Sequence, residues 1–417
     1  MTSEWNHFAL GEITELVIDY RGKTPKKLGG DWCKQGYRAL SAKNIKTGRI
    51  VQAETIRYID ESLYRKWMKD EVQRGDILIT SEAPFGQIFF WDSDEKIVLS
   101  QRLFCVRIKP EYDARFIYYY MTTPEFQSEL DGRATGTTVI GLRQPELMKC
   151  VIRCPEIQEQ KVIAAILSSI DAKIIANEKV NDNLQQQIKS LVTAWLVDYI
   201  PFGGEMPSDW CAISLASIAD FVSGYSYKGT ELQPSTTAMA TIKNFDRNGG
   251  FKLDGFKELI PSSKIKPCHY AEKFDVVVAH TDLTQKAEVI GNAEPIINLS
   301  GYEAIVFSMD LVKVVPKDNC VSKFMLAALL QHPRFKSHCL GYVNGTTVLH
   351  LSKKALPDYE LDFPTDPAVL APLDDALRVL YMQMATIVDE NRKLQDLRDT
   401  LLPRLMRGEI DVSNIDI

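Results

Sequence analysis

The chain has 417 residues, a length that allows two or three domains. Its hydrophobic fraction of 45% and charged fraction of 25% are those of ordinary globular proteins. The net charge of −6 gives no overall basic signature for nucleic acid, but it does not exclude DNA binding, because the local field decides that. The polar residues 1–10 do not form a signal peptide and no apolar run approaches a membrane span, so we expect a cytoplasmic protein without a membrane partner.

The cysteines and histidines show no pattern of metal ligands. None of the eight cysteines stands in a CxxC motif, and the six histidines have no ligand spacing. The closest cysteine pair, Cys150 and Cys154, has no matching second pair, which favours reduced thiols over a structural metal. We therefore predict neither a metal site nor a cofactor.

The first predicted domain covers residues 1–155 and mixes strands with helices. β-Branched and aromatic residues cluster at 75–80, 87–91 and 102–106, which predicts three strands. A short helix is expected at 114–121. The segment has the size of a single domain.

A long helix is predicted next, in residues 156–200. Pro155 and Glu156 suit a helix start, because proline lacks the N–H that has no partner there and the acid complements the helix dipole. From Ile163 to Trp195 the apolar positions step alternately by four and three residues, which averages to the period of a coiled-coil seam. A helix of about 58 Å cannot bury such a stripe against itself, so it needs a partner.

The same order of elements then returns. Asp366 and Pro367 suit the start of a second long helix, and Pro403 is expected to end or kink it. The predicted bounds in this half are 201–364 for the domain, 274–279 and 304–307 for strands, 323–330 for a short helix, and 365–417 for the second long helix with its tail.

An internal repeat relates the two halves. Trp5 returns 205 residues later as Trp210, and the second helix repeats the seam of the first 210 residues later, as Leu373 repeats Ile163. So long a period indicates a duplicated domain-plus-helix unit and not a solenoid. We predict an α+β fold in which two similar α/β-mixed domains alternate with two long helices that pair as an antiparallel coiled coil, with pseudo-two-fold symmetry. The predicted seam comprises Ile163, Leu167, Ile170, Ile174, Asn181, Leu184, Ile188, Leu373, Leu377, Leu380, Asn391, Leu394 and Leu401.

Polar residues interrupt this seam at a few positions. Asn177, Asn181 and Asn391 lie in it, and a buried asparagine costs stability but fixes the register of the pair. Arg398 takes an apolar position, so we expect the neighbouring Leu397 to cover that turn.

Five segments together resemble one known family. They are LLPRLMRGEI at 401–410, the Gly-Thr-Thr segments at 136–138 and 345–347, SAKNI at 41–45 and GDILIT at 75–80. The chain resembles, over essentially its whole length, the specificity subunit of type I restriction-modification systems. In that family the domains are target-recognition domains, and the long helices space them and carry the modification subunits.

The resemblance implies a non-catalytic subunit that recognises DNA for methylation and for defence against foreign DNA. Each domain would read one half of a bipartite target, and the helix pair would set the gap. The implied partners are double-stranded DNA, two modification (methyltransferase) subunits and restriction (translocase and nuclease) subunits. A coiled-coil scaffold that binds only proteins is the alternative.

Motif searches agree with a non-catalytic chain. An amino-methyltransferase needs an Asn/Asp/Ser-Pro-Pro-Tyr/Phe loop, and the sequence contains no Pro-Pro. A Walker loop is also absent. The looser Asp…Glu-x-Lys pattern of nucleases gives no convincing match.

Basic, amide and aromatic side chains near the predicted loops are the candidates for DNA contact. Residues 21–27 hold four cations and no acid, which fits either a solvated loop or a phosphate clamp. Residues 38–46 and 243–244 offer arginine and asparagine, which pair with guanine and adenine in the major groove. The tyrosines of 223–228 either stack on a base or pack internally. The candidates are Arg21, Lys23, Lys26, Lys27, Arg38, Lys43, Asn44, Lys46, Tyr225, Tyr227, Lys228, Lys243, Asn244, His280 and Thr281.

Two kinds of loop remain open between a functional and a structural interpretation. Residues 80–86 and 280–284 follow predicted strands, where loops often carry function but are also simple turns. The Gly-Thr-Thr loops offer N–H and hydroxyl groups to phosphate. Their identity in both halves argues against base reading, and we favour structural turns.

Overall fold

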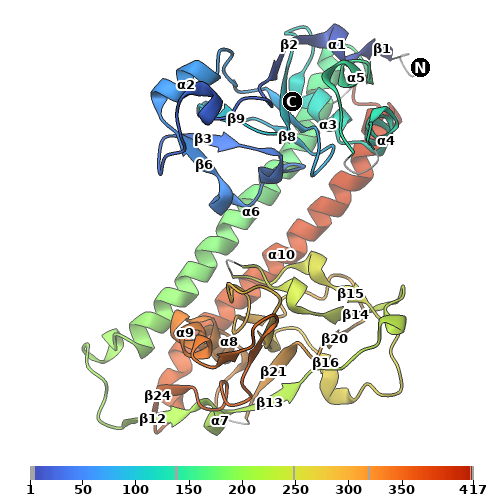
Figure 1. Cartoon of the computed structure of the whole chain (residues 1–417). Coiled ribbons are helices and arrows are strands. Elements are labelled where there is room, and N and C mark those ends of the chain that lie inside the picture. Colours follow the sequence, from blue (N-terminus) through green and yellow to red (C-terminus); the bar gives the residue numbers. More distant parts are fainter. Residues whose placement is uncertain (1–4, 137–139, 248, 318–319, 414, 416–417) are drawn as a thin grey trace. The chain divides into compact units, whose positions relative to one another are not determined.

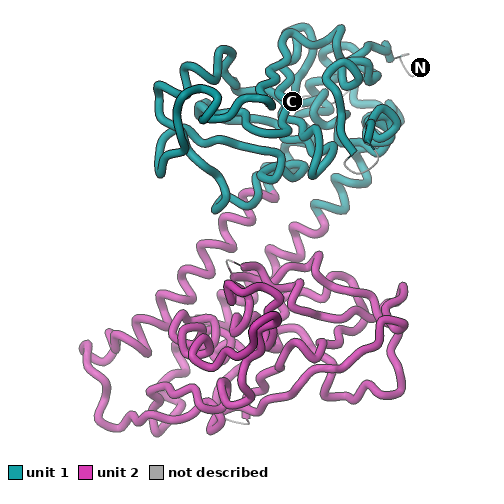
Figure 2. The backbone as a smooth tube through the Cα atoms, in the orientation of Figure 1, with its two compact units in different colours: residues 1–173, 394–417 teal, residues 174–393 magenta. Residues whose placement is uncertain are grey.

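A computed structural model describes residues 5–136, 140–247, 249–317, 320–413 and 415 (Figure 1). The chain divides into two compact units, which Figure 2 colours separately. Unit one comprises residues 1–173 and 394–417, and unit two comprises residues 174–393. Each unit contains one mixed domain and a part of both long helices. We call the domain of unit one, residues 5–155, arm one, and the domain of unit two, residues 201–364, arm two.

Arm one is built on a four-stranded antiparallel sheet with the order β2–β10–β7–β8. All four residues of β7 are buried, and they alternate between two cores. Ile77 and Ile79 pack with the helices that follow the sheet, whereas Leu78 packs with Trp67 on the other face. The sheet strands are β2 (Thr14–Asp19), β7 (Ile77–Thr80), β8 (Ile88–Phe90) and β10 (Leu103–Ile108).

Smaller elements complete arm one. A three-stranded sheet with the order β6–β3–β9 and the pairs β1–β11 and β4–β5 lie around the main sheet. Asp113 caps α3 by accepting a hydrogen bond from the N–H of Phe116 at 2.8 Å. The bounds are β1 (Asn6–Ala9), α1 (Leu10–Ile13), η1 (Lys26–Leu28), β3 (Tyr37–Leu40), η2 (Ala42–Asn44), β4 (Ile45–Lys46), β5 (Arg49–Ile50), η3 (Ala53–Thr55), β6 (Arg57–Ile59), α2 (Glu61–Trp67), β9 (Val98–Leu99), α3 (Ala114–Met121), α4 (Pro124–Arg133), α5 (Gln144–Leu147) and β11 (Val151–Cys154).

Arm two repeats this plan. Its main antiparallel sheet has the order β13–β21–β17–β19, and β17 is again buried on both faces. Val276 and Val278 face one core and Val277 faces the other. Ser322 caps α8 by accepting hydrogen bonds from two backbone N–H groups at 3.1 Å. The sheet strands are β13 (Ala219–Ser223), β17 (Val276–Ala279), β19 (Ala293–Pro295) and β21 (Leu311–Pro316).

The remaining elements of arm two form two further sheets, with the orders β15–β14–β20–β16 and β18–β23–β22, and the pair β12–β24. The strands predicted in both halves and the helices predicted at 114–121 and 323–330 are confirmed. The bounds are η4 (Ile200–Phe202), β12 (Trp210–Ser214), α7 (Leu215–Ile218), η5 (Gly229–Glu231), β14 (Thr237–Ala240), η6 (Ile242–Asn244), η7 (Leu253–Gly255), β15 (Lys257–Glu258), η8 (Pro267–His269), β16 (Tyr270–Ala271), β18 (Thr281–Asp282), β20 (Ala304–Phe307), α8 (Lys323–Gln331), α9 (Pro333–Leu340), β22 (Val343–Asn344), β23 (Leu349–Leu351), β24 (Glu360–Pro364) and η9 (Pro367–Leu370).

The two long helices are α6 (Ile157–Leu196) and α10 (Ala371–Met406), and each passes from one unit into the other. Within unit one, Asp171 of α6 binds Arg398 of α10 at 3.0 Å. Within unit two, Asn177 of α6 binds Asn391 of α10 at 2.7 Å. Residue numbers therefore rise along one helix as they fall along the other, so the helices pair in antiparallel fashion. The predicted fold class, mixed domains with two long helices, is confirmed, whereas the pseudo-two-fold symmetry stays a prediction.

Most of the predicted seam is buried, with two departures. Beyond Ile188 the buried residues of α6 are Val192 and Leu196, and not the expected Leu191 and Trp195. The apolar stripe there follows the ordinary helical period because this end of α6 packs on the core of arm two. The predicted residues Ile163, Leu167, Ile170, Ile174, Leu184, Ile188, Leu373 and Leu377 are buried, and Asn181, Leu380, Asn391, Leu394 and Leu401 are half-buried.

The expectation for Leu397 is wrong. Its side chain is 47% exposed, and Arg398 itself turns toward α6. The Arg398 guanidinium can lie in the seam because the Asp171 carboxylate meets it there. The same carboxylate accepts a hydrogen bond from the hydroxyl of Tyr119 on α3 at 2.7 Å, so Asp171 joins both long helices to arm one.

Pro403 does not end α10, whereas the alternative expectation, a kink at this proline, stays a prediction. Pro403 lies inside the helix, which continues to Met406. The following residues return to the core of unit one, where Val412 is buried and Gly408 lies against the ring of Trp5. Among the described residues no helix is both long and apolar enough to cross a membrane.

Candidate nucleic-acid interface

One end of the main sheet gathers the loops of each arm. In arm one Leu103 lies opposite Thr80, so the loops that follow β2 and β7 meet the start of β10. In arm two Leu311 lies opposite Ala279, which brings together the loops that follow β13 and β17. The structure therefore places most of the predicted DNA-binding residues at equivalent ends of two equivalent sheets.

A short hairpin lies beside these loops in arm one. It comprises residues 43–51 and contains β4 and β5. The N–H of Thr47 donates to Gln87 Oε1 at 3.0 Å, and the N–H of Gly48 donates to the carbonyl of Ile88 at 3.1 Å, so the hairpin is held at the start of β8. Its cations, Lys43, Lys46 and Arg49, are exposed.

Arm two carries the equivalent hairpin in residues 243–252, of which Asn248 lies outside the described residues. Asn292, immediately before β19, donates from Nδ2 to the carbonyl of Asp246 at 3.4 Å, as Gln87 holds the arm-one hairpin. A hollow of about 380 Å³ separates this hairpin from the loop after β17. Lys243, Arg247 and Lys252 line it on one side and Leu283, Thr284 and Val289 on the other.

The asparagines of these hairpins are buried and form hydrogen bonds within their own arm. Asn44 is 1% exposed, its carbonyl oxygen accepts from the N–H of Ser41 at 3.1 Å, and its amide donates to Thr55 Oγ1 at 3.0 Å. Asn244 is fully buried and repeats this cap with the N–H of Thr241 at 2.9 Å. Neither amide can meet a base without breaking these bonds, so we no longer propose Asn44 and Asn244 as base contacts.

The basic loop at 21–27 is only partly free to bind phosphate. Arg21 pairs with Asp19 at 2.8 Å and lies over the ring of Phe104. Lys23 donates to the carbonyl of Trp67 and lies 3.6 Å from the ring centre of Tyr20. Burial and the nearby Lys69 lower the pKa of Lys23, although Asp70 acts in the opposite direction. Lys26 and Lys27 remain exposed and are the cations of this loop that could reach DNA.

Arg38 and the tyrosines of arm two are also engaged. Arg38 forms a two-bond pair with the Glu95 carboxylate. Tyr225 is 5% exposed and donates to Glu231 at 2.9 Å, which identifies it as a packing residue. Tyr227 is half-buried and Lys228 is exposed.

The loop after β17 is organised by Asp282. Burial opposes ionisation of this carboxylate, but hydrogen bonds from the N–H groups of Val289, Thr284 and Ile290 outweigh it and place the pKa below its ordinary value. Thr281 is 7% exposed and donates to the Asp310 carboxylate at 3.0 Å. His280 is half-buried, and burial lowers its pKa. Arm one has an ion pair at the equivalent place, between Glu82 and Arg102 at 3.0 Å.

The Gly-Thr-Thr segments are only partly described. Thr137 and Thr138 lie outside the described residues. In arm two Gly345 has φ of +115°, and a side chain there would meet the carbonyl of Val348 at 2.2 Å. Gln285 donates to the carbonyl of Thr346 at 2.6 Å, which ties this turn to the loop after β17. A structural turn therefore remains our interpretation.

Several residues of this interface escaped the sequence prediction. They are Arg49, Gln87, Arg247, Lys252, Thr284 and Asn292, which lie on or beside the hairpins. The available signal was the repeat of Ser-x-x-Asn at 41–44 as Thr-x-x-Asn at 241–244, because aligning these caps aligns the cations that follow.

No cluster of three His, Cys, Asp or Glu side chains among the described residues could hold a metal ion. All eight cysteines are free thiols. Burial raises the pKa of Cys150 and of Cys154 to about 12, so both side chains are protonated thiols at neutral pH.

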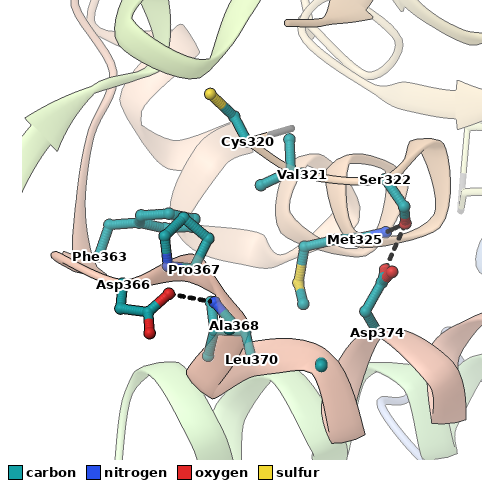
Figure 3. A pocket seen from close by; sticks show the side chains of 11 residues that line it. Cys320, Val321, Ser322, Met325, Phe363, Asp366, Pro367, Ala368, Leu370 and Asp374 are labelled. Carbon is teal, nitrogen blue, oxygen red and sulfur yellow. Dashed lines mark hydrogen bonds between the residues drawn. The ribbon is translucent and has the colours of Figure 1, made fainter. Parts of the chain in front are cut away.

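A larger hollow, of about 500 Å³, lies between the start of α8 and η9 (Figure 3). Both carboxylates in it are hydrogen-bonded: Asp366 caps η9 by accepting from the N–H of Ala368 at 3.0 Å, and Asp374 of α10 accepts from the hydroxyl of Ser322. Met325 and Phe363 line it with apolar surface. These groups secure the start of the second long helix and do not form an acid–base pair.

The comparisons with known proteins agree with this architecture. The family model for the type I restriction modification DNA specificity domain matches residues 2–186. The solved structure of the type I restriction-modification S subunit from M. genitalium matches with a TM-score of 0.54 and 17% identity, over 96% of both chains. This similarity shows a shared fold.

Curated relatives extend the similarity along the chain. The MjaVIII specificity subunit of Methanocaldococcus jannaschii is 28% identical over 203 residues, which span 47% of this chain and 46% of the relative. The MjaIX specificity subunit of the same organism is 22% identical and spans 82% of this chain and 79% of the relative. The HindI specificity subunit of Haemophilus influenzae is 22% identical and spans 82% and 88%, respectively.

Two mixed domains of the same plan, two long helices and a match to a DNA specificity domain are the features of a DNA-recognition protein. Residues 2–186 match the DNA specificity domain of type I restriction-modification systems, and 82% of the chain is similar to specificity subunits of such systems, as its sequence predicts.

Proposed function

We propose that each arm reads one half of a bipartite DNA target through its hairpin and the neighbouring strand-end loops, and that the helix pair sets the gap. The observation that carries this proposal is the repetition of the hairpin. Each copy has three cations, Lys43, Lys46 and Arg49 in arm one and Lys243, Arg247 and Lys252 in arm two.

The two copies differ where bases would be read. Arg247 approaches Glu288 at 3.4 Å beside the hollow of arm two, whereas arm one presents the Glu82–Arg102 pair. Cations shared by both arms can supply phosphate contacts, and residues that differ can supply sequence preference. Two arms that read different half-sites need this combination.

The long helices are the proposed docking surface for two modification subunits, which the restriction subunits would join. In unit two, α6 exposes Ile175 and Val180, at 50% and 42%, and α10 exposes Val379 and Met382, at 64% and 49%. Apolar side chains on a helix surface suit a partner that covers them. We place this complex in the cytoplasm, where its DNA and free thiols are expected.

Mapping modified adenines in DNA from cells that express this chain with its modification subunits tests the proposal. We expect one motif with two defined halves and a fixed unspecified gap, and two modification subunits per chain in the purified complex. A continuous motif without a gap, or a complex that saturates with a single modification subunit, would contradict it.

A further inference from the structure

A buried carboxylate in the fourth strand of the main sheet distinguishes arm two from arm one. Glu294 is the middle residue of β19 and lies opposite Val277, with 5% of its surface exposed. At the equivalent place in arm one, Phe89 of β8 lies opposite Leu78. A buried acid is costly unless hydrogen bonds satisfy it, so its presence in only one arm calls for a reason.

Glu294 connects the arm-two hairpin to a long helix. The N–H of Gly250 in the hairpin donates to Oε1 at 2.6 Å, and Gln331 at the end of α8 donates to Oε2 at 2.7 Å. The carbonyl oxygen of Gln331 accepts from the hydroxyl of Tyr381 on α10 at 2.6 Å. A continuous series of hydrogen bonds therefore runs from α10 to the hairpin within unit two.

At the hairpin end of this series, the backbone of Gly250 has a conformation that few other residues adopt. Gly250 has φ of +102°, in the left-handed region that favours glycine. The hairpin is also held by Asn292, as its counterpart in arm one is held by Gln87. The bond to Glu294 is thus an additional restraint, for which the Phe89 side chain of arm one offers no acceptor.

We propose that Glu294 is a positioning residue for DNA recognition by arm two, which holds the hairpin and ties it through Gln331 and Tyr381 to helix α10. This inference rests on the proposed function, because it takes the hairpin as part of the DNA interface. It makes the fit of arm two on its half-site depend on the hydrogen bonds of one carboxylate.

The surroundings of Glu294 make this restraint sensitive to pH. Burial raises the pKa of Glu294 to about 7, while the hydrogen bonds from Gly250 and Gln331 lower it and Asp246 raises it. The facing groups are the Gly250 N–H, the Gln331 amide, the Tyr381 hydroxyl, the Asp246 carboxylate and the apolar Val277. When Glu294 is protonated, its O–H group and the Gln331 NH2 group are both donors and cannot bond to each other. The hydrogen-bond series is then broken, or the Gln331 amide rotates to offer its oxygen instead.

The test uses the full chain in complex with its modification subunits and the target found by adenine mapping. Affinity is measured between pH 6 and 8 for the intact target and for duplexes with either half-site scrambled. Exchanging residues 205–364 for the second arm of a relative shows which half-site arm two reads. We expect the preference for the arm-two half-site to fall roughly tenfold toward pH 6, as for one lost charge-assisted hydrogen bond, and the arm-one preference to stay constant.

Two variants separate positioning from a structural role. Glu294→Gln keeps an acceptor for Gly250 but cannot titrate, so its arm-two preference should be reduced and independent of pH. Tyr381→Phe should reduce the preference and keep the pH dependence. Tyr199→Phe, which removes a hydroxyl–carboxylate bond of 2.7 Å to Asp362 elsewhere in unit two, should change neither.

The inference is overturned if Glu294→Gln follows the pH profile of the unmodified chain, or if both preferences fall equally in Glu294→Gln and Tyr381→Phe. If Glu294→Gln does not fold, the pH profiles of the unmodified chain and of Tyr381→Phe decide. Failure of the unmodified complex to prefer its target over scrambled DNA would instead contradict the proposed function, and the inference would fall with it.

Discussion

Cations of both hairpins are expected to contact phosphates. Replacing Lys43, Lys46 and Arg49 with Ala should weaken binding to target and non-target DNA alike, because phosphate contacts carry no sequence information. The slope of log affinity against log salt should become shallower by up to about three units, since each phosphate contact contributes about one unit. The corresponding replacement of Lys243 and Lys252 in arm two should act similarly, with a change of up to about two units.

A double Ala variant of Lys109 and Lys149 is the matched control. Lys109 follows β10 at the opposite end of the main sheet of arm one, and Lys149 lies shortly before β11, which pairs with β1 outside that sheet. Their removal should leave the salt slope unchanged. Equal slopes for the hairpin variant and the unmodified chain would show that the hairpin faces solvent.

A buried ion pair secures the main sheet of arm one. Asp76 is 1% exposed, and Arg107 binds both its oxygens at 2.9 Å. Arg107→Ala would leave a buried carboxylate without its cation, which costs about 3 kcal/mol of unfolding free energy. Urea denaturation measures this loss. Arg74→Ala, at an exposed ion pair, should leave the unfolding free energy nearly unchanged, and equal losses in the two variants would contradict the argument.

Residue chemistry alone did not separate buried from exposed polar groups. Asn44 and Lys46 are two positions apart, yet the first caps a turn inside the arm and the second points to solvent. The sequence makes Lys23 as good a candidate for phosphate contact as Lys26. In the structure, however, the ammonium group of Lys23 donates a hydrogen bond to the carbonyl of Trp67. Such differences depend on tertiary partners, which a local pattern does not contain.

Elements were more predictable than side chains, because their signals are periodic. The strands β7 and β17 follow from runs of β-branched residues, and the helix α6 follows from its heptad spacing. The prediction for α6 is less accurate after Ile188, where the helix packs in a core that arm two shares with α10. The domain boundaries and the choice of residues that contact DNA stay predictions.

The helix pair is expected to measure the gap between half-sites. A heptad added to both helices keeps the seam in phase and adds about 10 Å, or about three base pairs at 3.4 Å each. The arms would also rotate by about 100° around the DNA, because a turn contains about 10.5 base pairs. Selection from a library of targets with varied gaps should recover the longer gap or weakened binding. Recovery of the original gap with full affinity would exclude a ruler role.

At the scale of the whole molecule, duplication is the central feature. The two arms repeat the main sheet, the capped hairpin and its amide tie, through Gln87 in arm one and Asn292 in arm two. They differ in the groups around the hairpins, such as Glu294. This combination explains how one chain can hold two independent readers on a shared helix pair.

Exchange of residues 205–364 for the second arm of a relative tests this claim most directly, with the target of the chimeric complex read by adenine mapping. We expect one half of the motif to change to that of the relative, while the other half stays as in the unmodified chain. A motif in which both halves change, or in which neither changes, would contradict two independent arms.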